Sequence, residues 1–330
     1  MARAEMVLLL FVTANCAIGF IPALLTAQGQ RGTKTHRIGV LTDNTPHSLF
    51  AEGFRGSLRD LGYVEGRNLA IDWRSTEGGS APLNDLASEL VRSKVDVIVA
   101  TYPAAAFAAK RATTTIPIVM VHTPDPVQLG LVASLARPGG NVTGLTSLSA
   151  DLSMKQLELL KEAVPRASRV AVLWNPGNPW HPITVKGLAA GGRALKLQLQ
   201  MVPVQGPGEF QDAFATMRKE RAQAVLFLAD PVTYVYRKQL ADLAISHRLS
   251  SMAGPREFAE AGCLLSYWAN STDLSRQTAS YVDKILKGAR PEDLPIEQPT
   301  QYELVVNLKT AKTLALTVPS SLRLRATTIE

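Results

Sequence analysis

Residues 125–146, with the sequence DPVQLGLVASLARPGGNVTGLT, divide this chain of 330 residues into two halves. On both sides of them, short apolar strands alternate with helices, so the segment is a candidate crossover between two lobes. Gly139 and Gly140 suit a tight turn before a strand better than a phosphate-binding loop. We therefore expect residues 141–147 to form the strand that crosses from one lobe to the other.

The first half repeats a unit of strand, loop and helix. Residues 37–41 (RIGVL) are a short apolar run typical of a strand, and apolar side chains from Phe50 to Leu61 then recur at the spacing of one helical face. Gly62 provides the stop signal of that helix. The further elements expected in this half are a strand at 69–73, a helix at 83–91, a strand at 95–100, a helix at 103–112 and a strand at 116–121.

The second half has the same order of elements at similar intervals. Continuous apolar strands that alternate with helices indicate a parallel sheet covered by helices on both faces. The sequence therefore predicts an α/β fold with two lobes of one architecture. The expected elements of this half are a strand at 169–174, a helix that begins near Thr184, a strand at 197–204, a helix at 210–219 and a strand at 224–228.

The C-terminal residues return to both lobes. A long helix is expected at 274–287, ended by Gly288, and a proline-spaced link at 291–299 leads to a strand at 302–307 and a helix at 308–316. This tail is too small to fold alone, so it must pack on the lobes. We assign to lobe 1 residues 36–145 and about 269–299, and to lobe 2 residues 146–268 and about 300–330.

The N-terminus has the pattern of a secretory signal peptide. Arg3 precedes an apolar stretch at 6–25, so we expect residues 1–27 to be removed and the protein to be periplasmic or otherwise extracytoplasmic. An uncleaved membrane anchor is the alternative because Glu5 offsets Arg3, whereas the residues before Cys16 disfavour its lipidation. No later segment is apolar over the roughly 18 residues that a membrane span requires.

Composition and motifs argue against nucleic-acid binding and catalysis. The formal charge is +7, but Lys and Arg are scattered, so we expect no nucleic-acid partner. GxGxxG after the first strand, a P-loop and GxSxG do not occur. Cys263 is the single cysteine once the signal is removed, and we expect it to be a small buried hydrophobe. We therefore expect that the protein is not an enzyme and that it has neither catalytic residues nor a cofactor.

The histidines are far apart in the sequence and show no metal-ligand spacing. His47 and His122 could face the crevice of lobe 1, and His181 could approach it from lobe 2, which makes a metal-dependent hydrolase an alternative. Surface or capping roles explain these residues better. We therefore expect no metal site.

Loops that follow the strands are the expected place of a ligand site. In open parallel sheets, ligands bind beyond the carboxyl ends of the strands. Aromatic rings at those ends could stack on an apolar or flat ligand, and we expect two or three of them to reach one. The aromatic residues at or just after strand ends are Tyr102, Trp174, Trp180, Tyr267 and Trp268.

Helix starts in these loops supply polar groups. Pro103 suits a first helical turn, so the free N–H groups of Ala104 and Ala105 could hold a carboxylate. Asp125 and Asp230 could accept a hydrogen bond from an ammonium or hydroxyl group of a ligand. Each also suits a helix N-cap before proline, and for Asp230 the cap is favoured.

Two runs, LARPGGNVTG at 135–144 and NLKTAK at 307–312, have the specificity of family motifs. With them, the chain resembles the extracytoplasmic solute-binding proteins of ABC transporters, in the group that includes tryptophan-binding, TrpX-like proteins. The resemblance implies two Rossmann-like lobes with parallel sheets and a multi-strand hinge, the type I fold of periplasmic binding proteins. The segments that carry it are 53–68, 95–120, 125–146, 157–176, 266–268 and 281–316.

The resemblance also implies a function and a set of binding residues. We expect a monomer that closes on an amino-acid-like or aromatic solute and delivers it to a membrane permease. The alternative is a sensor that presents a solute to a membrane receptor. Many relatives have a small residue or glycine in place of Tyr102 and Trp268, so the identity of the solute is not carried over. The binding residues implied are Asn44, Thr101, Tyr102, Asp125, Asn175, Asn178, Asp230 and Tyr267.

Overall fold

The computed structural model describes residues 35–43, 46–76, 82–147 and 149–330. By its contacts the chain divides into the units Met1–Lys34 and Thr35–Glu330, and the fold described here is that of the second unit. The expected signal peptide at 1–27 and the expected binding residue Asn44 lie outside the described residues.

The first sheet has five parallel strands in the described chain, in the order β2-β1-β3-β4-β5. Strands and helices alternate along the chain as the sequence predicts, and the helix expected at 103–112 is confirmed at both ends. The elements are β1 (His36–Thr42), α1 (Leu49–Asp60), β2 (Leu69–Ser75), α2 (Leu83–Arg92), β3 (Val97–Ala100), α3 (Pro103–Ala112), β4 (Ile118–Pro124) and β5 (Val142–Ser147).

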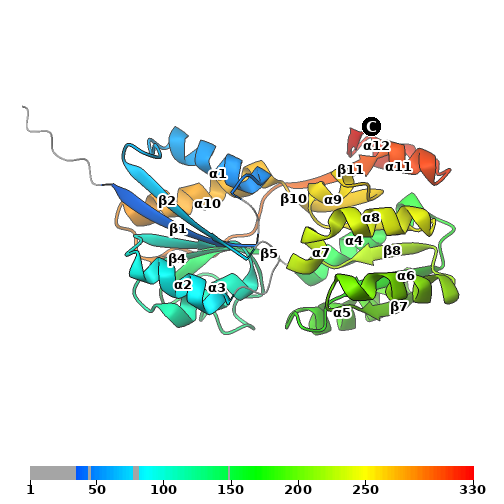
Figure 1. The fold of residues 1–330 in the computed structure, drawn as a ribbon, viewed down its shortest axis with the longest axis horizontal. Coiled ribbons are helices and arrows are strands. Elements are labelled where there is room, and N and C mark those ends of the chain that lie inside the picture. The colour runs from blue at the N-terminus through cyan, green and yellow to red at the C-terminus, as the bar shows by residue number, and fades with distance from the viewer. Residues whose placement is uncertain (1–34, 44–45, 77–81, 148) are drawn as a thin grey trace, which may run out of the picture. The chain divides into compact units, whose positions relative to one another are not determined.

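Helices cover both faces of this sheet, and together they form the first lobe (Figure 1). α1 packs beside α10 (Ser271–Leu286) on one face, and α2 packs beside α3 on the other. Phe54 and Leu58, which share one face of α1, meet Leu274 of α10 in a buried cluster. The tail therefore supplies one of the helices that complete the first lobe.

The second sheet has seven strands in the described chain, in the order β12-β11-β10-β9-β8-β6-β7. All pairings are parallel except that of β10 with β11, which is antiparallel. This pair departs from the all-parallel expectation because the chain leaves β10 for α10 and returns in the opposite direction. The strands are β6 (Arg169–Trp174), β7 (Gln198–Pro203), β8 (Ala224–Phe227), β9 (Ser250–Ala253), β10 (Leu265–Ala269), β11 (Tyr302–Asn307) and β12 (Thr327–Ile329).

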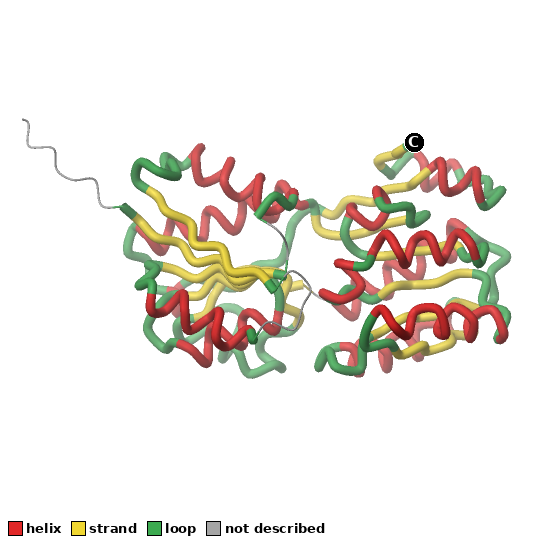
Figure 2. The backbone as a smooth tube through the Cα atoms, viewed as in Figure 1, coloured by secondary structure: helices red, strands yellow, loops and turns green. Residues whose placement is uncertain are grey.

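Helices also cover both faces of the second sheet, which gives the second lobe (Figure 2). α4 packs beside α5, and α6 packs beside α8. None of the described helices is both long and apolar enough to cross a membrane. The helical elements are α4 (Ser149–Ala163), α5 (His181–Ala194), η1 (Pro207–Glu209), α6 (Phe210–Lys219), α7 (Pro231–Val235), α8 (Arg237–Ser246), α9 (Arg256–Glu260), η2 (Pro291–Asp293, in the link), α11 (Leu308–Thr313) and α12 (Ser320–Arg323).

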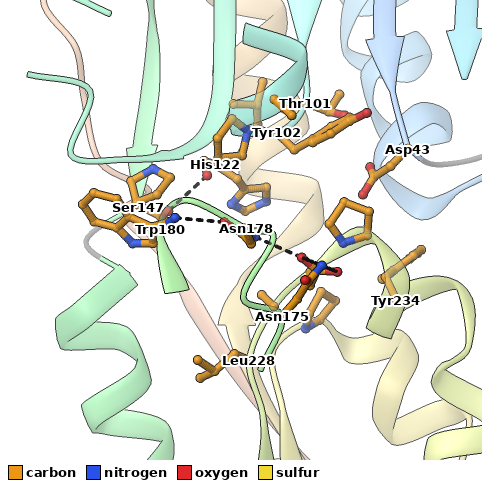
Figure 3. A pocket seen from close by; sticks show the side chains of 18 of the residues that line it. Asp43, Thr101, Tyr102, His122, Ser147, Asn175, Asn178, Trp180, Leu228 and Tyr234 are labelled. Atoms are coloured by element: carbon orange, nitrogen blue, oxygen red, sulfur yellow. Dashed lines mark hydrogen bonds between the residues drawn. The ribbon is translucent and has the colours of Figure 1, made fainter. Parts of the chain in front are cut away.

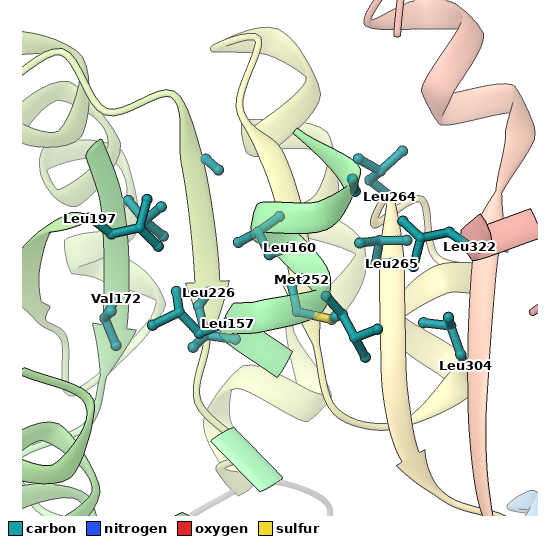
Figure 4. Close-up of a cluster of buried hydrophobic side chains, with 14 of the residues drawn as sticks. Leu157, Leu160, Val172, Leu197, Leu226, Met252, Leu264, Leu265, Leu304 and Leu322 are labelled. Atoms are coloured by element: carbon teal, nitrogen blue, oxygen red, sulfur yellow. The ribbon is translucent and has the colours of Figure 1, made fainter. Parts of the chain in front are cut away.

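Leucines of α4 form much of the core on one face of the second sheet (Figure 4). Leu157 and Leu160 are fully buried against Leu226 and Met252 of the strands. Burial of each such side chain stabilises the fold by about 1.5–3 kcal/mol. α4 is not among the predicted elements, although Leu152, Leu159 and Ala163 recur at the spacing of one helical face. On the opposite face Cys263 is fully buried, as predicted, and burial raises the pKa of its thiol to about 12.

The described chain passes between the two sheets at three places: after β5, after β10 and before β11. The predicted crossing strand at 141–147 is in fact a strand of the first sheet, because β5 pairs along its length with β4. Leu145 of β5 also forms a β-bridge with Glu297 of the link that leads to β11. Two of the crossing segments are therefore hydrogen-bonded neighbours.

Candidate functional site

A pocket of about 530 Å³ is lined by residues that follow the strands of both sheets (Figure 3). From the first sheet come Asp43 after β1 and Thr101 and Tyr102 after β3. From the second sheet come Asn175 after β6 and Asp230 beyond β8. The pocket thus lies at the carboxyl ends of parallel strands, where the sequence predicts a binding crevice.

The start of α3 forms part of the first lobe's wall. Thr101 donates a hydrogen bond from its hydroxyl to that of Thr42 (2.8 Å), which fixes it at the end of β3. Tyr102 then precedes Pro103, the first residue of α3, and its side chain makes no cap to the helix. The positive end of the helix dipole therefore points toward the pocket from Ala104, which lines it. Burial raises the pKa of the Tyr102 phenol, which stays protonated.

Asp230 organises the wall of the second lobe. Its carboxylate accepts a hydrogen bond from the backbone N–H of Val232 (2.9 Å), so the predicted N-cap of α7 is confirmed. The side-chain amides of Asn175 and Asn178 also donate to it, at 3.2 Å and 3.0 Å. These bonds hold Asp230 and both asparagines in one arrangement.

His181, at the start of α5, is a structural histidine in the same wall. The backbone N–H of Asn175 donates to its Nδ1 (2.9 Å), and its Nε2 lies 3.0 Å from the carbonyl oxygen of Ala229. The proton of the neutral ring therefore belongs on Nε2, where it is donated to that carbonyl. Burial lowers the pKa of His181 against the opposing effect of Asp230. Both ring nitrogens are thus used to hold neighbouring loops together.

Asp43 is a second carboxyl group of the pocket. It follows β1 and is half-buried. Burial, with the negative charge of Asp230 acting in the same direction, raises the pKa of Asp43 to about 7. The carboxyl group therefore changes its charge near neutral pH, and it lines the same pocket as Asp230 of the other lobe.

The structure brings together most of the residues that the resemblance implied. Asp125 and Tyr267 are placed elsewhere: Asp125 accepts from the N–H of Gln128 (3.0 Å) in the turn after β4, and Tyr267 stacks on Tyr302 with ring centroids 5.7 Å apart. Side chains alternate along β10, so Trp268 faces the pocket and Tyr267 faces away. The implied residues that line the pocket are Thr101, Tyr102, Asn175, Asn178 and Asp230.

Three of the five aromatic residues at strand ends line the pocket: Tyr102, Trp180 and Trp268. Trp174 and Tyr267 pack against the core of the second lobe instead. Aromatic side chains at strand ends therefore divide between the pocket and the core. Whether the three rings contact a solute stays a prediction.

Several lining residues are not among the predicted binding residues, notably Asp43, His122, Tyr234 and Glu257. Asp43 could have been found from its place beside Asn44 in the loop after the first strand. For His122 the sequence offers a metal-ligand role, in a set with His47 and His181, and favours a surface or capping role; neither includes contact with a solute. Among the described residues, no group of three or more His, Cys, Asp or Glu side chains is arranged to hold a metal ion.

Known proteins share both the fold and the sequence pattern. A tyrosine-binding protein of Clostridioides difficile is 27% identical over 284 residues, which are 85% of this chain and 81% of that protein. A conserved domain protein of Vibrio cholerae has 28% identity and a TM-score of 0.83, and the match covers 90% of this chain and 100% of that one. An ABC domain of Streptococcus pneumonia in complex with L-Trp has 25% identity and a TM-score of 0.82 with the same coverage.

The family assignment follows from a match over most of the chain. The model of the family described as ABC transporter substrate binding protein matches residues 40–330. This match confirms the resemblance that the motifs at 135–144 and 307–312 carry, and the two lobes with their parallel sheets confirm the predicted α/β fold. The chain therefore belongs to the ABC transporter substrate binding protein family.

Proposed function

We propose that this protein is the extracytoplasmic solute-binding protein of an ABC importer and that it captures an amino-acid-like solute with an aromatic side chain. The observation that carries the proposal is the pocket itself, which combines two carboxyl groups with three aromatic rings. Two similar proteins are named for tyrosine or are bound to L-Trp, which supports the same class of solute.

Charged residues of the pocket favour a solute with a positive group. Asp43, Asp230 and Glu257 are acidic, whereas Arg111 is the one lysine or arginine among the described lining residues. The guanidinium group of Arg111 donates hydrogen bonds of 2.8 and 3.3 Å to the side-chain oxygen of Asn84. An ammonium group between Asp43 and Asp230 would therefore be held by both lobes and would relieve the repulsion between the two carboxyl groups.

The aromatic residues favour a flat, apolar portion of the solute. Tyr102 comes from the first lobe, and Trp180 and Trp268 come from the second. Offset or edge-to-face contacts between such rings and an aromatic solute are worth about 0.5–1.5 kcal/mol each beyond the area that they bury. The start of α3 offers N–H groups for a carboxylate. One solute with all three groups is an aromatic amino acid.

Capture would work by a shift between open and closed arrangements of the lobes. A solute that contacts both lobes binds the closed arrangement more tightly, and this difference in affinity is what drives closure. A closed complex would then present a surface to a membrane permease. We infer from the apolar N-terminal sequence that the protein is exported, and we propose that it acts as a monomer.

Thermal unfolding with a panel of solutes tests this proposal. Purified protein should melt at a higher temperature with aromatic amino acids than without them, since a ligand that binds only the folded state stabilises it. Sugars and nucleosides should have no such effect. Mass spectrometry under native conditions should find a bound solute of amino-acid mass after purification from the original host. The proposal would be rejected if no solute of the panel raised the melting temperature and mass spectrometry found no bound solute.

A further inference from the structure

His122 occupies an irregular position in the backbone of the first sheet. The register of β4 with β5 shifts between Met120 and Thr123, and His122 lies in this interruption with a φ of 55°. A positive φ is uncommon for residues other than glycine and is often found at functional sites. The hydroxyl of Ser147 donates to the carbonyl oxygen of His122 (3.3 Å) and helps to hold this conformation. The irregularity lets the imidazole line the pocket.

Trp268 determines which nitrogen of His122 carries the proton. The indole Nε1–H of Trp268 donates to His122 Nε2 at 3.2 Å, and the two ring centroids are 5.1 Å apart. An indole N–H can only donate, so Nε2 must be unprotonated and the proton of the neutral ring must be on Nδ1. Burial lowers the pKa of His122 to about 4, so the ring is neutral at neutral pH.

Trp268 is itself held firmly in place. It lies on β10 of the second sheet, and its ring lies against Gly254, where an added Cβ would come within 2.7 Å of the indole. A larger residue than Gly254 would therefore displace the indole. Since His122 belongs to β4 of the first sheet and Trp268 to β10 of the second, their hydrogen bond also connects the two lobes (Figure 3 shows His122 at the pocket).

The Nδ1–H of His122 lacks a partner among the described residues. Nδ1 is a buried atom without a hydrogen-bond partner, whereas both ring nitrogens of His181 in the same pocket are partnered. A buried N–H without an acceptor costs about 1–3 kcal/mol, so such a group is expected to have a use. Because His122 lines the pocket, its Nδ1–H is a candidate donor to an acceptor on a solute.

We propose that His122 is a specificity-determining binding residue, whose Nδ1–H donates to a carboxylate oxygen of the solute in the tautomer that Trp268 imposes. The proposal rests on the proposed capture of an amino-acid-like solute by this pocket. A neutral ring with a fixed N–H accepts no hydrogen bond at that nitrogen, so it rejects an ammonium group there. With Asp43 and Asp230 for the ammonium, His122 would make the pocket select amino acids over the corresponding amines.

Calorimetric titration tests this selection. L-tyrosine and L-tryptophan would be compared with tyramine and tryptamine, which differ from them by the carboxylate alone. Wild-type protein should bind the acids at least tenfold more tightly than the amines. His122→Ala should weaken binding of the acids tenfold or more and leave the amines within about twofold. His122→Asn tolerates a positive φ and keeps an N–H donor, so it should retain part of the preference. His247→Asn, outside the pocket, is the matched control.

The tautomer is tested in the protein without solute by nitrogen-15 NMR of the histidine rings. His122 should be neutral and protonated on Nδ1 at pH 7, and His181 should be protonated on Nε2. Trp268→Phe removes the indole donor, so the preference for acids should fall although His122 is intact. Either of two results would overturn this inference alone. One is a His122 ring that is charged or protonated on Nε2; the other is a His122→Ala variant that prefers the acids as strongly as wild-type protein does. Failure of all four compounds to bind wild-type protein would overturn the proposed function as well.

Discussion

Asp43 and Asp230, which follow strands of different sheets, bring two carboxyl groups to one pocket. Asp230 accepts hydrogen bonds from the backbone N–H of Val232 and from the side-chain amides of Asn175 and Asn178. Asp43 lines the same pocket with a pKa raised to about 7 by burial and by the charge of Asp230. A solute ammonium placed between them would shift the proton equilibrium of Asp43 toward the carboxylate.

Solute affinity should therefore depend on pH near neutrality. An ammonium group binds the ionised form of Asp43, which is the minor form below pH 7 and the major form above it. The dissociation constant should fall by about tenfold for each pH unit below the pKa of Asp43 as the pH rises, and it should level off above it. Titrations from pH 5.5 to 8.5 measure this slope, and proton release in buffers of different ionisation enthalpy confirms it. Asp43→Asn should bind more weakly but without the slope; a slope that persists in this variant would assign the dependence to another group.

Stability without solute should show the opposite dependence on pH. The pKa of Asp43 is raised from an ordinary value of 3.8 to about 7 in the folded protein, so the folded state binds the proton more tightly than the unfolded chain. The contribution of Asp43 to the free energy of unfolding is therefore complete below pH 4, and it is lost as the pH rises toward 7. The difference in melting temperature between wild type and Asp43→Asn, followed from pH 4 to 8, isolates this contribution. A constant difference across that range would contradict the raised pKa.

Gly144 should be required for the irregular pairing that positions His122. Its φ is 126°, and a Cβ there would lie 2.2 Å from the carbonyl oxygen of Met120. Gly144→Ala should lower the free energy of unfolding by more than about 2 kcal/mol, because it combines backbone strain with a steric clash. Gly56→Ala is the control: Gly56 lies inside α1 with no atom within 4 Å of an added Cβ, so alanine should be neutral or slightly stabilising. Chemical denaturation of both variants measures the contrast.

Leu160 of α4 should be essential for the stability of the second lobe. It is fully buried, and its replacement by alanine should cost about 2–5 kcal/mol because it leaves a cavity in the core. Leu324, which is 88% exposed, is the matched leucine, and Leu324→Ala should change the free energy of unfolding by less than about 0.5 kcal/mol. Equal effects of the two substitutions in urea unfolding would show that α4 does not pack as described.

The spacing of apolar residues in the sequence predicts most of the strands and helices of the fold. The first and second runs of strands and helices follow from patterns such as Phe54 and Leu58 on one helical face, and α3, β6 and α6 have the predicted bounds. The antiparallel return of β11 beside β10 was not predictable in the same way, because strand direction depends on long-range connections that leave no local pattern.

The site could be predicted less completely than the fold. Loops after strands were the right places to search, and Thr101, Asn175 and Asp230 lie in the pocket. Which side chain of a strand end faces the pocket depends on register, as Tyr267 and Trp268 show. His122 lies in the pocket because of a shift in strand pairing, and such a shift cannot be read from the order of residues.

Calorimetric titration of L-tyrosine into wild-type protein and Asp230→Asn tests the central claim most directly. Wild-type protein should bind one molecule with a dissociation constant of about 1 μM or less, which corresponds to about −8 kcal/mol or stronger. Asp230→Asn keeps a similar shape but loses the negative charge, so its affinity should be at least tenfold weaker, whereas Asp242→Asn on the exposed face of α8 should bind as wild type does. Absence of binding to wild type, or equal affinity in Asp230→Asn, would contradict the account.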